Sequence, residues 1–383
     1  MTAERYRPAA MEIRQKEDGD MGAIRRKETN RSTNVRYSFL KILTGSDLSR
    51  RRLPFMAAES SRPGPVLWVT ACGHGDEVGG AVIIQEIFKR IRRSGLSRGS
   101  LYSFPLMNPI GFETSSRNIT LTKEDLNRSF PGNVSGSLGE RIADKIFTSI
   151  MQTNPALVVD LHNDWIRSIP YTVIDPESDI QREQVCEKAR SFAGKTGLLI
   201  VRETDGLEGA LTYNLLKNDV PALTLELGES FVVNEKNIQY GIESLGNILS
   251  DLEMMEPGDE PFAYPLPEAY EGRILAYSDR PLCSTSGIIR FRAKPGDLVK
   301  ARQPIAKIYN AFGRLQETVL ALSDGIVLGH SDSSVAFPGM PVMAFGVPRE
   351  HLRTQDDAKR VGGERRTAER HIGGAKRGRP RTG

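Results

Sequence analysis

Short apolar segments alternate with amphipathic segments along the middle of the chain, and this rhythm constrains the fold more than any other feature. Residues 66–71 are almost entirely apolar, which is typical of a strand buried on both faces. Residues 80–91 carry apolar side chains at the spacing of one helical face. The alternation favours an α/β fold with a mixed, mainly parallel sheet and helices on both faces. The other expected strands are one or two edge strands within 35–55, then 101–106, 156–161, 171–174, 198–201 and 222–227, and the other expected helices are 138–151, 180–196 and 234–252.

The segments around this region differ from it in composition. Residues 1–34 are polar, charged and without periodicity, so we expect a disordered segment. Residues 257–267 contain four prolines and predict a linker. The linker separates an α/β domain, 35–256, from a small all-β domain, 268–348, in which apolar residues recur at every second position. The basic, Gly-rich segment 349–383 is expected to be a disordered tail.

Charge and cysteine content limit the cellular setting. The formal charge is +4, but residues 349–383 alone carry +6, so the rest of the chain is slightly acidic. No apolar run approaches the ~18 residues of a membrane helix, and no apolar segment follows the charged start as it would in a secretory signal. Three scattered cysteines, Cys72, Cys186 and Cys283, indicate reduced thiols in a cytoplasmic protein. Cys72 is two residues from His74, so a metal role is an alternative to a buried place at a strand end.

A histidine and a carboxylate, His74 and Glu77, lie three residues apart in the glycine-rich segment after the first apolar run. His162 ends another apolar run, 156–161. Two histidines and one carboxylate with an open fourth position are a recurring ligand set of hydrolytic zinc. The H-x-x-E pattern is weak by itself, because a surface loop produces it easily. The prediction gains strength because the chain has only five histidines, and the other three, His330, His351 and His371, lie in the β domain and the tail.

Two further carboxylates stand at strand positions close to these candidate ligands. Asp160 shares a strand face with His162, so it is a candidate to orient that imidazole, with the capping of a backbone group as the alternative. Glu226 interrupts an apolar strand, where a carboxylate is costly unless it is paired or functional. We interpret Glu226 as a general base and acid, with a structural ion pair as the alternative and Glu229 as the weaker candidate.

A long polar loop between the two histidines contributes candidate substrate contacts. Asn127 and Arg128 are suited to a free carboxylate on a substrate, because arginine grips carboxylates through two parallel hydrogen bonds. Arg117 is suited to a carbonyl oxygen that gains charge during the reaction. Without their context, each of these arginines would be interpreted as a solvated loop residue.

Taken together, these motifs resemble the succinylglutamate desuccinylase/aspartoacylase family, a branch of the zinc-carboxypeptidase-like hydrolases. The resemblance spans roughly residues 35–347 and rests on the order and spacing of five blocks: Gly73-His74-Gly75-Asp76-Glu77, Asn108-Pro109, Asp125-Leu126-Asn127-Arg128-Ser129-Phe130-Pro131-Gly132, Asp160-Leu161-His162 and Leu225-Glu226.

The resemblance implies a mononuclear zinc amidohydrolase that removes an acyl group from an N-acylated amino acid or a related amine by means of metal-activated water. It implies one Zn²⁺ per subunit, a small-molecule substrate and a β domain similar to a biotinyl/lipoyl-type barrel that caps the active site. The implied residue roles are zinc ligation by His74, Glu77 and His162, general base/acid catalysis by Glu226, carbonyl polarisation by Arg117 and carboxylate binding by Asn127 and Arg128. Asn163-Asp164-Trp165 departs from the family, in which a small or hydroxylated residue often follows the histidine.

Three other readings of the sequence remain. A zinc carboxypeptidase acting on short peptides would share the metal and the Asn-Arg pair. A swinging-cofactor role for the β domain would need a lysine on an exposed hairpin, which the segment 310–314 lacks. Nucleic-acid binding would depend on the tail alone, where 376–381 resembles an AT-hook core. We expect no membrane partner, and a homo-oligomer is compatible with the sequence.

Overall fold

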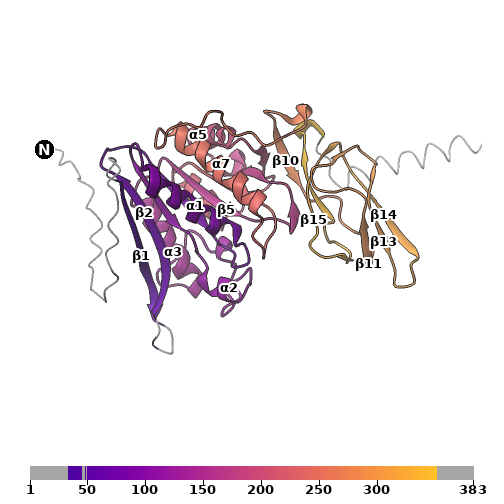
Figure 1. Ribbon diagram of the computed structural model, residues 1–383. Helices are drawn as coiled ribbons and strands as arrows, with labels where there is room; N and C mark the ends of the chain where they lie inside the picture. The colour runs from indigo at the N-terminus through magenta and orange to yellow at the C-terminus, as the bar shows by residue number, and fades with distance from the viewer. Residues whose placement is uncertain (1–32, 45–47, 49, 352–383) are drawn as a thin grey trace, which may run out of the picture. The chain divides into compact units, whose positions relative to one another are not determined.

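The computed structural model describes residues 33–44, 48 and 50–351 (Figure 1). The expected disordered N-terminal segment therefore lies outside the described residues, except for its last two positions, which belong to the first strand. The same holds for the basic tail from residue 352 onward.

One large mixed sheet organises the described residues. Its first strands, in spatial order, are β1 (Thr33–Thr44), β2 (Arg50–Ser60), β4 (Ser100–Phe104), β3 (Val66–Ala71), β5 (Leu157–His162), β9 (Ala222–Glu226), β7 (Tyr171–Ile174) and β8 (Leu199–Arg202). Strands β4, β3, β5 and β9 are parallel neighbours, as are β7 and β8, whereas β1–β2, β2–β4 and β7–β9 are antiparallel. The prediction of a mixed α/β sheet with a parallel centre is confirmed.

Helices cover both faces of this sheet because successive strand residues point to opposite sides. Leu67 and Val69 of β3 belong to the core under α1 (Gly79–Ser94) and α7 (Glu235–Asp251), which lie side by side (Figure 1). Trp68, between them in sequence, belongs to the core under α3 (Leu138–Met151) and α6 (Leu211–Lys217). The expected start of α3 is confirmed, because Ser137 and Glu140 form a reciprocal capping box.

The structure differs from the sequence-based expectation at three elements. The N-terminal edge strands are long, twelve and eleven residues, and form a hairpin. The helix expected over 180–196 begins three residues later, as α5 (Glu183–Lys195), and an unexpected short helix, α4 (Glu177–Ile180), precedes it and ends at Gln181, which adopts a left-handed conformation with φ of 56°. Helix α6 was not expected, because polar side chains interrupt its apolar pattern. The short helices are α2 (Pro109–Glu113), η1 (Leu126–Arg128), η2 (Glu268–Tyr270) and η3 (Arg349–His351).

The C-terminal β-rich region supplies strands to two sheets. The large sheet continues from β8 through β10 (Ile274–Ser278), β17 (Met343–Val347), β15 (Gly325–His330) and β12 (Leu298–Val299), and β6 (Arg167–Ser168) pairs with β15. The second sheet has the order β14 (Leu315–Leu320), β13 (Pro304–Tyr309), β11 (Gly287–Phe291) and β16 (Val335–Ala336). Ile289 and Ile308 of the second sheet share a core cluster with Val327 and Phe345 of the first.

Two findings bear on the expected setting of the protein. No helix in the described part of the chain combines the length and apolar character that a membrane crossing requires. All three cysteines are free and buried, as the sequence predicted.

Candidate metal centre and surrounding cavity

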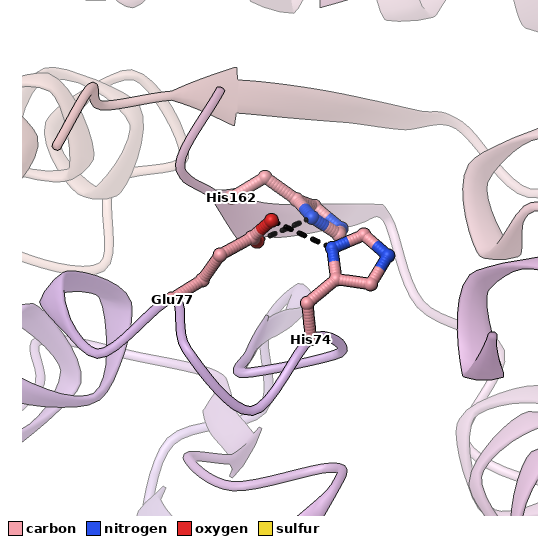
Figure 2. Close-up of side chains that lie close together, drawn as sticks. All are labelled: His74, Glu77 and His162. Atoms are coloured by element: carbon pink, nitrogen blue, oxygen red, sulfur yellow. Dashed lines mark hydrogen bonds and ion pairs between the residues drawn. The ribbon is translucent and has the colours of Figure 1, made fainter. Parts of the chain in front are cut away.

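His74, Glu77 and His162 converge on one point at the carboxyl ends of the central strands. His74 and Glu77 lie between β3 and α1, and His162 is the last residue of β5. One donor atom from each residue lies within 4.8 Å of the donor atoms of the other two. Nδ1 of His74 is 2.6 Å from Oε1 of Glu77, and Nδ1 of His162 is 2.8 Å from Oε2 of Glu77. Figure 2 shows the carboxylate of Glu77 facing both imidazole rings, with a contact to each.

A close backbone approach holds the loop that carries His74 and Glu77. A Cβ atom at Gly75 would lie 2.0 Å from the carbonyl carbon of Gly111, so only glycine fits here. The backbone N–H of Gly75 donates to the carbonyl oxygen of Ser116 at 3.1 Å. The conformation of the loop that carries His74 and Glu77 is therefore fixed by residues 111–116, which lie more than thirty residues further along the chain.

Each imidazole is also held by a second carboxylate on its far side. Nε2 of His162 lies 2.8 Å from Oδ2 of Asp160, whose other oxygen accepts a hydrogen bond from Thr70 at 2.7 Å. Nε2 of His74 lies 3.1 Å from Oδ1 of Asp125. Metal-binding histidines usually use one ring nitrogen for the ion and the other for such an orienting group. Sequence reasoning identified Asp160 for this position but gave no role to Asp125.

The donor set fits a divalent metal ion. His74 and Glu77 are each 3% exposed and His162 is 4% exposed, so water competes little for them. Burial opposes ionisation of Glu77, but the neighbouring rings of His162 and His74 outweigh it and lower the pKa of the carboxyl. Two imidazoles and one ionised carboxylate are the ligands of catalytic zinc sites that keep a position open for substrate.

Glu226 lies beside this group at the end of β9. Its carboxyl is buried, and Oε2 has no hydrogen-bond partner among the described residues. Burial and the nearby carboxylate of Asp164 raise the pKa of Glu226 well above its ordinary value. Glu229, the weaker sequence candidate, instead accepts a hydrogen bond from the Asn234 amide.

The three loop residues expected to contact substrate line the same cavity, which has a volume of about 190 Å³. The guanidinium of Arg117 lies 3.7 Å from Oε1 of Glu77 and 3.3 Å from Oδ2 of Asp125. The side-chain oxygen of Asn127 accepts from the backbone N–H of Leu211 at 3.0 Å, so the NH₂ group is the part of this amide that can donate to a ligand. Arg128 donates to the backbone carbonyl of Asn127 at 2.8 Å. All seven sequence-predicted site residues thus line one cavity, which is also lined by Asn163, Asp164, Val173, Asp175, Glu203, Leu207, Ala210, Thr212 and Thr224.

Sequence reasoning missed the acidic part of this lining. Asp175 directly follows β7 and Glu203 directly follows β8. Glu226 was identified because it interrupts an apolar strand, and a carboxylate directly after a buried strand was a related signal that was available for these two residues. Burial and the proximity of Asp175 raise the pKa of Glu203 to about 7, and burial raises the pKa of Asp175 to about 6.

Comparisons with known proteins agree with the motifs and the fold. Residues 63–252 match the family model of the succinylglutamate desuccinylase/aspartoacylase catalytic domain. A relative from Halomonas elongata, N-alpha-acetyl-L-2,4-diaminobutyric acid deacetylase, is 26% identical over 290 residues, which are 72% of this chain and 80% of the relative.

Solved structures show the same fold. A succinylglutamate desuccinylase from Silicibacter sp. TM1040 superposes with a TM-score of 0.69 at 19% identity, over 84% of this chain and 99% of the other. The product-bound ectoine utilization protein EutE (DoeB) from Ruegeria pomeroyi superposes with a TM-score of 0.70 at 19% identity, over 84% and 100%. Residues 63–252 therefore form a catalytic domain of the succinylglutamate desuccinylase/aspartoacylase family, a family of deacylases, which confirms the resemblance found in the sequence.

Proposed function

We propose that this chain is a zinc-dependent deacylase that hydrolyses the linear amide bond of an N-acylated amino acid. The observation that carries the proposal is the convergence of His74, Glu77 and His162 beside Glu226, whose Oε2 has no hydrogen-bond partner among the described residues. The curated relative is named as a deacetylase of an N-acetyl amino acid, which supports the same substrate class. The buried, free cysteines fit a reducing compartment, so we place the enzyme in the cytoplasm.

His74, Glu77 and His162 would hold the zinc ion, because nitrogen-rich donor sets suit zinc better than magnesium or calcium. When bound, the ion would lower the pKa of water and polarise the amide carbonyl. Asp125 and Asp160 would fix the rings of His74 and His162, so that each presents Nδ1 to the ion.

Glu226 would carry the proton through the reaction. It would take a proton from the attacking water while the water oxygen bonds to the carbonyl carbon. It would then give that proton to the amine nitrogen as the C–N bond breaks, which releases a carboxylic acid and a free amine. Burial and the nearby carboxylate of Asp164 raise the pKa of Glu226 well above its ordinary value, so this carboxyl holds a proton more readily than an ordinary glutamate and suits donation to the leaving amine.

Arg117 and the Asn127–Arg128 pair would position the substrate. The half-exposed side chain of Arg117 brings its guanidinium to 3.7 Å from Oε1 of Glu77, so the guanidinium would stabilise the carbonyl oxygen as it gains charge. The side-chain NH₂ of Asn127 and the other N–H groups of Arg128 would hold the carboxylate of the amino acid.

A substrate panel with metal analysis tests the proposal. Acetyl, succinyl and longer acyl derivatives of amino acids, together with short peptides, are incubated with the purified protein, and released amine is measured alongside zinc content. We expect release from at least one acyl amino acid, loss of release after chelation and its return with zinc. Release from peptides but from no acyl amino acid would contradict the proposal.

A further inference from the structure

The carboxyl of Asp164 lies in the cavity wall and has no part in the mechanism described above. Asp164 comes two residues after His162, the last residue of β5, and it lines the cavity together with the candidate metal ligands and Glu226. After burial, Asp164 has the largest influence on the raised pKa of Glu226, ahead of the ring of His162. The influence of one charge on another falls with distance, so the Asp164 carboxyl lies close to the candidate proton carrier.

Tyr171 orients the carboxyl of Asp164. Its hydroxyl donates to Oδ2 of Asp164 at 2.5 Å. Tyr171 is 1% exposed and shares a core cluster with Leu199 and Leu328, so packing restricts the rotation of its ring. It is also the direct partner of Glu226 across the antiparallel strands β7 and β9. The strand pairing that positions Glu226 therefore also positions the group that holds Asp164.

The Asp164 carboxyl has acceptor capacity that its contacts within the protein do not use. Besides the hydroxyl of Tyr171, the backbone of Trp165 forms a hydrogen bond to it. No lysine or arginine in the described part of the chain forms an ion pair with Asp164. Because a carboxyl group has about four lone-pair sites on its two oxygens, Asp164 can accept a further hydrogen bond from a ligand in the cavity.

The proposed substrate brings one donor at the bond that is broken. A linear amide has a carbonyl oxygen and an N–H group, which point in opposite directions in the usual trans form. In the proposed mechanism the carbonyl oxygen faces Arg117 and the metal position, so the N–H needs an acceptor of its own. An N–H that is buried in an enzyme cavity without an acceptor weakens binding.

We propose that Asp164, held by Tyr171, accepts a hydrogen bond from the N–H of the scissile amide, so that the enzyme prefers amides to esters. This inference rests on the proposed deacylase function and adds a residue that recognises the bond to be broken. An ester has an oxygen atom in place of the N–H, and the lone pairs of that oxygen would face the carboxyl oxygen of Asp164. A site that is built to accept from an N–H discriminates against an analogue that lacks it.

A matched amide and ester test the inference on the zinc-loaded, full-length protein. The acyl amino acid that is cleaved best in the substrate panel is compared with the O-acyl ester of the 2-hydroxy acid that has the same side chain, as O-acetyllactate corresponds to N-acetylalanine. The ratio of kcat/KM for the amide to kcat/KM for the ester is measured. We expect Asp164→Ala to lower this ratio by about tenfold or more.

An unchanged ratio in Asp164→Ala would overturn the inference and leave the deacylase function standing. If no acyl amino acid is cleaved by the zinc-loaded enzyme, the deacylase function itself fails, and the inference fails with it. The zinc content of each variant is measured on the same sample, so that a loss of metal is distinguished from a loss of amide preference.

Two further variants separate the hydrogen bond from other effects of Asp164. Tyr171→Phe keeps the carboxyl but removes the donor that orients it, so it should lower the same ratio, and it provides a second test if Asp164→Ala does not fold. Asp164→Asn keeps a side-chain oxygen that can accept, so it should lower the ratio less than Asp164→Ala does. An equal loss in the two Asp164 variants would show that the carboxyl acts through its charge, and would overturn the hydrogen-bond assignment.

Matched controls account for general disturbance of the cavity. Val173→Ala alters the cavity lining on the same strand as Tyr171 without removing a polar group. Tyr213→Phe removes a hydroxyl from another buried tyrosine, whose ring contacts Lys217 and which does not line the cavity. Both controls should keep the amide-to-ester ratio of the unaltered protein, and a loss in them as large as in Asp164→Ala would overturn the assignment.

Discussion

His162 and Glu226 are direct partners across the parallel strands β5 and β9, each as the last residue of its strand. This register places the candidate proton carrier next to a candidate metal ligand without any contribution from a flexible loop. The two side chains are therefore fixed relative to one another by the backbone hydrogen bonds of the central sheet, which is the most rigid part of such a fold.

Replacing Glu226 by glutamine should separate metal binding from turnover. The amide keeps the size of the side chain but cannot carry a proton, so we expect unchanged zinc content and a kcat lower by ~10²-fold or more. Glu229→Gln is the matched control, because Glu229 is hydrogen-bonded to Asn234 and does not line the cavity. A Glu226→Gln enzyme with the kcat of the unaltered protein would remove Glu226 from its role.

Asp160→Asn should weaken zinc binding without removing a ligand. Asp160 holds Nε2 of His162 and is itself held by Thr70, so the change disturbs the orientation of the imidazole and reduces its basicity. We expect zinc affinity to fall by roughly 10–100-fold, as measured by competition with a chelator. Thr70→Val keeps the carboxylate and should cause a smaller loss. Equal zinc affinity in Asp160→Asn and the unaltered protein would show that Asp160 has only a structural role.

Arg128→Ala should act mainly on substrate binding. The side chain donates to the backbone carbonyl of Asn127 at the edge of the cavity and forms no ion pair with the three candidate metal ligands in the described part of the chain. Its loss should therefore raise KM for carboxylate substrates by about tenfold with little change in kcat. Arg93→Ala, an exposed position on α1, serves as the control. If KM is unaltered in Arg128→Ala, this arginine does not grip the carboxylate.

The buried carboxyl of Glu203 should make folding stability depend on pH. Its pKa is about 7 in the folded protein against about 4.5 in the unfolded chain. Between these values the folded protein holds a proton that the unfolded chain has lost, so the contribution of Glu203 to the free energy of unfolding falls as pH rises. Glu203→Gln should therefore gain stability relative to the unaltered protein between pH 5 and pH 8, by about 2 kcal/mol.

Urea denaturation of both proteins across this pH range measures the difference. Titrating groups far from Glu203 contribute equally to the two proteins, so the comparison reports on Glu203 together with its interactions with Asp175 and Glu226. A stability difference that stays constant with pH would show that this carboxyl is ionised throughout the range.

Much of the fold could be predicted because buried parallel strands leave a plain signal in the sequence. The apolar runs of β3, β5 and β9 marked the centre of the sheet, and the site followed from the polar residues at their ends. Helix α6 left no such signal, because Thr212, Tyr213 and Asn214 break its apolar periodicity. It is nevertheless buried, because the fold satisfies its polar groups from elsewhere in the chain, as when Asn214 donates to the carbonyl of Phe130.

The part of the site that escaped prediction depends on contacts between distant segments. Asp125 reaches His74 only because its loop folds back over the strand ends, where Asn127 is fixed by the backbone of Leu211. Glu203 and Asp175 meet only because β7 and β8 are neighbours in the sheet. Strand order and loop path come from the packing of the whole domain, and a local pattern of residues does not reveal them.

Zinc titration of metal-free protein, with activity followed in the same sample, tests the central claim most directly. We predict that one zinc ion binds per chain and that deacylase activity returns in proportion to bound zinc. His74→Ala and His162→Ala should bind no zinc and regain no activity. His330→Ala, a control in the β-rich region, should bind zinc and regain activity like the unaltered protein. Full activity in rigorously metal-free protein, or tight stoichiometric zinc binding by His162→Ala, would contradict the account.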